Sequence, residues 1–236
     1  MKKNVFASLF LGLGLMVSSF TSKIVENYEF NDPETIIANY IEAVGGKANV
    51  DKIRNSVMIM EAEFQGTSLV IKGISDQENS RLLQETSVMG NIAQKTVLVN
   101  GKGKMIAMGQ EQELPEEMVA SLKAQTFVFP ELHYQELGYT LEAQGTEEIE
   151  GEMANILVIS APNGTKTTEY YSVASGLKLR SSSDVQGDVM FKDYTEVEGV
   201  MIPMTLLIKN AMLPTALETK ITSIKFNQEL TDEDFN

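Results

Sequence analysis

The 236-residue chain contains no cysteine, no tryptophan and a single histidine, His133. Without cysteine it can form no disulfide, so we expect its stability to come from the burial of apolar side chains. The missing cysteine also excludes lipid attachment of the bacterial lipoprotein kind, which modifies a cysteine at the signal cleavage point. A zinc site normally draws on several His or Cys ligands, so we expect no metal and no other cofactor. For His133, beside Tyr134 in an aromatic segment, a packing or surface role is favoured over catalysis.

Positive charge is scarce as well. The sequence has 19 Lys and Arg against 33 Asp and Glu, which gives a formal net charge of −14. Such a surface repels phosphate backbones and anionic headgroups, which argues against a nucleic-acid partner. The acidic stretch 147–152 lacks the ligand spacing of a calcium loop, and residues 101–104 lack the Gly-Lys-Ser/Thr ending of a phosphate loop. The sequence therefore predicts no catalytic residues and no enzyme.

The one long apolar run lies at the N terminus. Two lysines precede an apolar stretch from Val5 to Val17, and small residues follow it. A positively charged N-terminal region, a short apolar segment and a cleavage site of small residues are typical of a secretory signal peptide. No later stretch approaches the roughly 18 apolar residues that a membrane span needs. We expect a signal peptide over residues 1–22 and a mature domain over residues 23–236 that has no stable membrane span.

Two segments carry helix signals. Asp32 is suited to cap a helix whose first residue is Pro33, and Gly45-Gly46 is suited to end it. A second helix is expected over residues 116–124, directly after Pro115. We expect both to cover a larger sheet as a lid. The lid residues would be Ile37, Tyr40, Ile41, Val44, Met118 and Leu122.

From residue 56 the hydrophobic period changes from helical to alternating. Met58, Met60 and Phe64 alternate with Glu61 and Glu63, which indicates a strand with one buried face. Similar runs, separated by turn signals, recur to residue 226. We expect a mainly β fold with some helix: one antiparallel sheet of about 11 strands, which would curl strongly instead of staying flat. The acidic tail, residues 231–236, is expected to be loosely held.

Four segments together carry a family resemblance. They are the helix ending in Gly-Gly-Lys at residues 37–47, the strand 57–64, and the hairpins at 170–179 and 193–203. In this order they resemble LolA-like proteins, the outer membrane lipoprotein-sorting superfamily, of the type found in Bacteroidetes. The resemblance implies a half-open β-barrel with helices lidding or plugging one side. In the lipoprotein carriers of that family, the concavity shelters acyl chains during transit across the periplasm.

The resemblance implies a periplasmic, soluble, non-enzymatic carrier of a lipid or of lipoprotein acyl chains. The superfamily also includes domains attached to insulinase-like zinc peptidases, so the alternative is an interaction module for an exported peptidase or envelope complex. Methionine suits variable cargo because its side chain is unbranched and polarizable, although ordinary core filling explains it equally well. The expected cavity residues are Met58, Met60, Phe64, Leu69, Ile71, Met105, Leu177, Leu179, Met190 and Met204.

Overall fold

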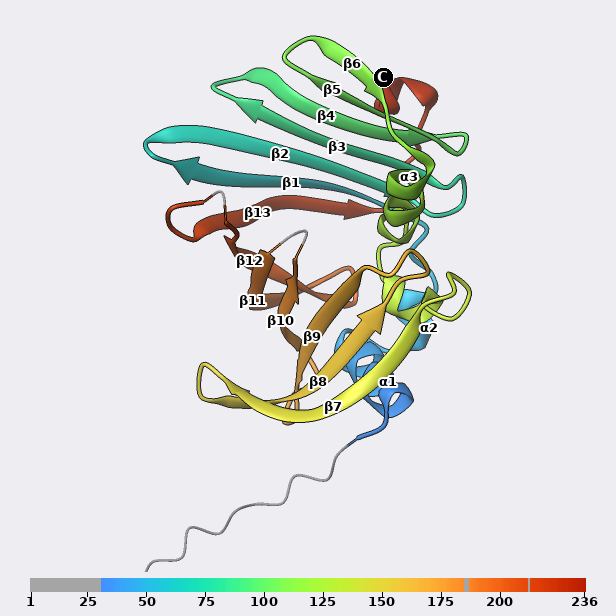
Figure 1. Cartoon of the computed structure of the whole chain (residues 1–236), viewed down its shortest axis with the longest axis vertical. Helices are drawn as coiled ribbons and strands as arrows, with labels where there is room; N and C mark the ends of the chain where they lie inside the picture. Colours follow the sequence, from blue (N-terminus) through green and yellow to red (C-terminus); the bar gives the residue numbers. More distant parts are fainter. Residues whose placement is uncertain (1–30, 185–186, 212) are drawn as a thin grey trace, which may run out of the picture.

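The computed structural model describes residues 31–184, 187–211 and 213–236, so the expected signal peptide over residues 1–22 lies outside the described residues. Within these ranges thirteen β-strands form a single sheet (Figure 1). The strands are β1 (Asn55–Phe64), β2 (Thr67–Asp76), β3 (Arg81–Val88), β4 (Asn91–Val99), β5 (Lys102–Ala107), β6 (Gln110–Glu113), β7 (Thr140–Ile149), β8 (Glu152–Ser160), β9 (Lys166–Ser172), β10 (Lys178–Ser183), β11 (Gly187–Val197), β12 (Val200–Lys209) and β13 (Leu217–Phe226).

The two edges of this sheet, β6 and β7, are consecutive strands in the chain. The spatial order is β6-β5-β4-β3-β2-β1-β13-β12-β11-β10-β9-β8-β7, so the pairing of β1 with β13 joins two meanders. A long sheet accumulates twist and curls, and here it stays open between β6 and β7 (Figure 1). The expected mainly β, half-open antiparallel fold with helices is confirmed. The sheet has thirteen strands instead of about 11.

The strand that sequence reasoning missed is β6. Its sequence, Gln-Glu-Gln-Glu, has no apolar alternation, and all four side chains are exposed. It forms because the Met108-Gly109 turn, with φ of 51° and 77°, folds the chain back onto β5. Backbone pairing alone therefore creates this edge strand, and its charges protect it from pairing with other chains.

In the described part of the chain six short helices accompany the sheet. They are α1 (Pro33–Ala43), α2 (Lys47–Val50), α3 (Glu116–Lys123) and the 3₁₀ turns η1 (Ala124–Thr126), η2 (Pro130–His133) and η3 (Asp232–Phe235). As expected, the Asp32 side chain caps α1 by accepting a hydrogen bond from the Thr35 amide at 2.8 Å. None of the helices in the described part of the chain is long and apolar enough to cross a membrane.

The main core lies between α1 and the concave face of the sheet. In Figure 1, α1 and α2 lie against the half of the sheet that contains β7 and β8. Ile36 and Ile41 of α1, with Val44 at its C-terminal cap, are buried in one core with Leu157 of β8 and Tyr171 of β9. This apolar face, not intrinsic helix propensity, holds the short helix in place.

The opposite face of β1–β4 is covered by the C-terminal tail. Phe235 is only 2% exposed and packs against Ile74, Leu83 and Val97, while the guanidinium of Arg81 lies 4.3 Å from the centre of its ring. The expectation of a loosely held tail is therefore wrong. One aromatic residue anchors the acidic segment, because burying its ring offsets the cost of ordering the chain.

Candidate functional site

A cavity of about 490 Å³ lies between the two halves of the sheet, beneath α3 and the segment that joins β6 to β7. This volume is in the range, about 300–1,000 Å³, that is usual for small-molecule sites. The lining residues are Gln84, Gln94, Thr96, Met105, Leu114, Met118, Ser121, Leu122, Ala124, Gln125, Pro130, Tyr134, Tyr139, Ile159, Ala161, Thr165, Thr167, Glu169, Ser181 and Ser183.

The helix α3 is held over the cavity by one small apolar cluster. Val119, on its buried face, packs with Leu82 and Leu98 of the sheet. A Cβ on Gly103 would lie only 2.9 Å from the side chain of Val119, so the glycine lets the helix approach β5 closely. The opposite side of α3 is less covered, and Met118 is 51% exposed.

Three of the residues expected in the cavity or lid line it together: Met105 of β5 and Met118 and Leu122 of α3. They come from different elements, which the connection between the two sheet edges brings together. The sequence pattern placed each on an apolar face, but only the chain path over the open edge makes them neighbours.

Four other expected cavity residues, Met58, Met60, Leu177 and Met204, are half-buried and pack against the main core. The remaining three on this face, Phe64, Leu69 and Ile71, are also half-buried. Leu69 pairs with Ala62 and Ile71 pairs with Met60, so these side chains share the concave face. They extend an apolar band beyond the cavity.

Leu179 and Met190 lie elsewhere, contrary to expectation. Both pack with Tyr170 in a cluster on the other face of the sheet. The reason is the register of β10: Lys178 points to the concave side, where it contacts Glu131 of η2, so the next residue, Leu179, faces the other side. Leu177 packs against the main core just before β10 begins, so the expected alternation through residues 177 and 179 does not hold.

The lid residues of α1 are divided between core and groove. Tyr40, Ile41 and Val44 are buried in the main core, whereas Ile37 is only half-buried. Ile37 and Ile41 also line a groove of about 450 Å³ between α1 and η2. Thus α1 fills much of the concave side, and α3 is the more exposed of the two helices.

A buried ion cluster lies directly behind the cavity wall, and sequence reasoning did not find it. Lys178 Nζ on β10 lies 2.6 Å from Glu131 Oε1 on η2 and 2.7 Å from Glu169 Oε1 on β9. The hydroxyl of Tyr171 donates a hydrogen bond to Glu169 Oε2, whereas Glu131 Oε2 is buried without a partner in the described residues. Two carboxyl groups share one ammonium, so the cluster has no positive charge to spare for another group. A glutamate within a strand, as at residue 169, is the only signal that could have suggested it.

The cluster shifts the pKa values of the groups around it. Burial by itself lowers the pKa of Lys178, but the carboxylates of Glu131 and Glu169 outweigh burial and raise it well above its ordinary value. Burial raises the pKa values of Tyr40 and Tyr171 well above their ordinary value, and the same two carboxylates raise them further. Lys178 is therefore firmly charged and the two tyrosines firmly neutral at physiological pH.

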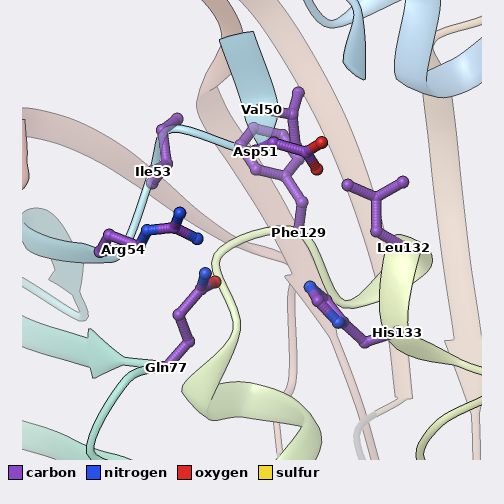
Figure 2. Close-up of a pocket in the computed structure, with 8 residues that line it drawn as sticks. All are labelled: Val50, Asp51, Ile53, Arg54, Gln77, Phe129, Leu132 and His133. Carbon is purple, nitrogen blue, oxygen red and sulfur yellow. The ribbon is translucent and has the colours of Figure 1, made fainter. Parts of the chain in front are cut away.

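A second cavity, of about 260 Å³, lies between η2 and the chain that joins α2 to β1. Figure 2 shows the side chains of Arg54, Gln77 and His133 pointing toward this space. The ring of His133 stacks on Phe127 with 4.0 Å between centroids, and its Nδ1 lies 3.2 Å from Glu136 Oε2. These contacts are those of a packing residue at the edge of the surface.

The comparisons with known proteins rest on structure alone. No family model matches the chain, and no curated protein matches it. Three solved structures superpose on 87% of it, each with a TM-score of 0.56. The first is a DUF1329 family protein from Desulfovibrio piger, 12% identical and covered over 98% of its length. The second is a LolA superfamily protein from Nitrosomonas europaea, 11% identical and also covered over 98%.

The third structure is a domain named for outer membrane lipoprotein sorting, from Vibrio parahaemolyticus, which is 13% identical and covered over 97% of its length. At this level of identity the likeness concerns the backbone and not the site residues. The narrower Bacteroidetes-type resemblance stays a prediction. The chain has the fold of the LolA superfamily and of the outer membrane lipoprotein-sorting domains, as the resemblance in its sequence implies.

Proposed function

We propose that this protein is a non-enzymatic carrier or binder of a molecule that bears an acyl chain, exported by its N-terminal signal and working in the periplasm. One observation carries the proposal: the half-open sheet leaves a cavity of about 490 Å³ beneath α3. A carrier needs such a space, because the acyl chain must be taken out of water and later released.

The apolar part of the lining suits an acyl chain. The strands β5 and β8 contribute Met105 and Ile159, and the segment before α3 contributes Leu114. The helix α3 itself contributes Met118 and Leu122. Each buried methylene contributes about 0.8 kcal/mol, so about ten of them would give on the order of 8 kcal/mol before the cost of association. The half-buried band around Leu69 and Ile71 would take a longer chain.

The lining does not favour catalysis. Its charged group, Glu169, has both carboxylate oxygens engaged, one by Lys178 and one by Tyr171. Among the described residues that line the cavity there is no histidine, lysine or arginine that could activate one of the serines or threonines there. The cavity is therefore better suited to holding a molecule than to transforming it.

The decisive experiment is native purification followed by organic extraction and mass spectrometry. We expect acyl-chain lipids at near-stoichiometric amounts, and their uptake again after delipidation and refolding. Absence of extractable lipid, together with failure to bind any acyl-chain probe, would contradict the proposal. A stoichiometric protein partner recovered with an empty cavity would instead support the interaction-module alternative.

A further inference from the structure

The polar part of the cavity lining has a distinct chemistry. Besides its apolar residues, the cavity is lined by three glutamines, three threonines and three serines. Gln84, Gln94 and Thr96 lie on one half of the sheet, and Thr167, Ser181 and Ser183 lie on the other. Amides and hydroxyls can both donate and accept hydrogen bonds. The lining therefore offers uncharged hydrogen-bonding groups from two opposed walls.

The part of this lining that the structure describes has no cationic side chain. Among the described lining residues the charged side chain is that of Glu169, and none of these residues is Lys, Arg or His. The nearby ammonium of Lys178 is already within 2.7 Å of two carboxylates and its side chain is 9% exposed. It is therefore not available to a ligand.

Because the described part of the lining offers uncharged hydrogen-bonding groups and no cation, we expect the cavity to bind uncharged headgroups in preference to anionic ones. A phosphate placed in the cavity would lose its hydration without gaining a cation. A hydroxyl-bearing headgroup would exchange its water hydrogen bonds for those of amides and hydroxyls, which costs little. The net charge of −14 adds repulsion of anions at longer range.

Resting on the proposed carrier function, we infer that the cargo is an amphiphile with an uncharged, hydroxyl-bearing headgroup, of the acylglycerol or glycolipid class, and not an anionic phospholipid. The acyl chain lies against Met105, Met118 and Leu122. The headgroup lies between the opposed polar rows that contain Gln94 and Thr167.

The test compares two probes with the same apolar chain, monododecanoylglycerol and dodecyl phosphate. Each is titrated calorimetrically into delipidated full-length protein at pH 7.5, below its micelle concentration. We expect the glycerol ester to bind at least about tenfold more tightly. Equal or tighter binding of the phosphate would overturn the headgroup inference and leave the carrier function standing. Binding of neither probe would overturn both.

A charge variant sharpens the test. Gln94 is exposed within β4 and lines the cavity, so Gln94→Lys places a cation there at little cost to folding. We expect Gln94→Lys to narrow or reverse the preference for the glycerol ester. The matched control is Gln144→Lys, on an exposed residue of β7 outside the cavity lining, which should leave the preference unchanged. If the ratio of the affinities for the glycerol ester and the phosphate were unchanged in Gln94→Lys, the inference would be contradicted. If this variant fails to fold, the ratio measured for the unmodified protein decides.

Discussion

Lys178 Nζ lies 2.6 Å from Glu131 Oε1, and this buried ion pair joins the sheet to the segment that spans its open edge. Lys178 belongs to β10, whereas Glu131 belongs to η2, between α3 and β7. The rings of Tyr40 and Tyr171 lie 5.4 Å from the ammonium and shield it from water. The pair thus fixes the connection that forms part of the cavity wall.

The first prediction concerns the removal of this ammonium. Lys178→Met would leave the carboxylates of Glu131 and Glu169 buried without a counter-charge, which should lower the free energy of unfolding by about 3–5 kcal/mol. Urea unfolding of the variant and of the unmodified protein measures this loss of stability. Lys220→Met, which breaks the exposed pair with Glu218, is the control and should change stability by less than about 1 kcal/mol. Equal effects of the two substitutions would show that the buried cluster is not structurally important.

The second prediction concerns alkaline pH. In the folded protein the pKa values of Tyr40, Tyr171 and Lys178 are raised above their ordinary values of 10.0 and 10.5. Folding therefore favours the protonated forms, so their contribution is complete below about pH 10 and is lost as the pH rises through the higher folded values. Urea unfolding between pH 7 and pH 11 should show stability falling only above about pH 10. A steep fall between pH 7 and pH 9 would contradict this assignment.

Local signals in the sequence were sufficient for most elements of the fold. Asp32, Pro33 and the glycine pair after Val44 define α1, and alternation defines most strands, because these features act through neighbouring residues. β6 could not be found this way, since its pairing follows from the preceding turn and not from an apolar pattern. The anchoring of Phe235 was missed for a similar reason: its partners lie more than a hundred residues away.

The site was less predictable than the fold. Leu177 packs against the main core, but Leu179 faces the other side of the sheet, because Lys178 between them points to the concave side and contacts Glu131 and Glu169 there. Glu169 and Lys178 lie on the paired strands β9 and β10, but Glu131 is far from both in sequence, and only tertiary packing adds it to the cluster. The polar residues of the cavity face one another only because the sheet curls, and the residue pattern of a single strand does not predict that curvature.

The third prediction concerns the junction between α1 and the β11–β12 hairpin. Gly45 has φ of +127°, and a Cβ there would lie 2.4 Å from the Gly199 carbonyl oxygen. Next to it, the Met201 amide donates a hydrogen bond to the Val44 carbonyl at 2.9 Å. Gly45→Ala should therefore cost on the order of 3 kcal/mol or more, because both strain and a backbone shift are required.

The control for Gly45→Ala is Gly90→Ala. Gly90 also has a positive φ, +81°, but a Cβ there would meet nothing within 4 Å. It should cost only the left-handed backbone penalty, about 1–2 kcal/mol. Urea unfolding of both variants measures the difference. Equal losses would mean that the end of α1 can move away from the hairpin without cost.

The last prediction tests the cavity with a matched pair of methionines on neighbouring parts of the chain. Met105 lines the cavity, whereas Met108, at the β5–β6 turn, is 96% exposed. Met105→Trp should fill space that an acyl chain would occupy, so its affinity for an acyl-chain probe should fall by about tenfold or more, equivalent to about 1.4 kcal/mol. Met108→Trp adds the same bulk outside the cavity and should bind like the unmodified protein. Because both variants keep the fold-defining contacts, their circular dichroism spectra should match. If the two variants bound a fluorescent fatty acid equally well, the acyl chain would have to lie outside this cavity, and the half-buried band around Leu69 and Ile71 would become the site to test.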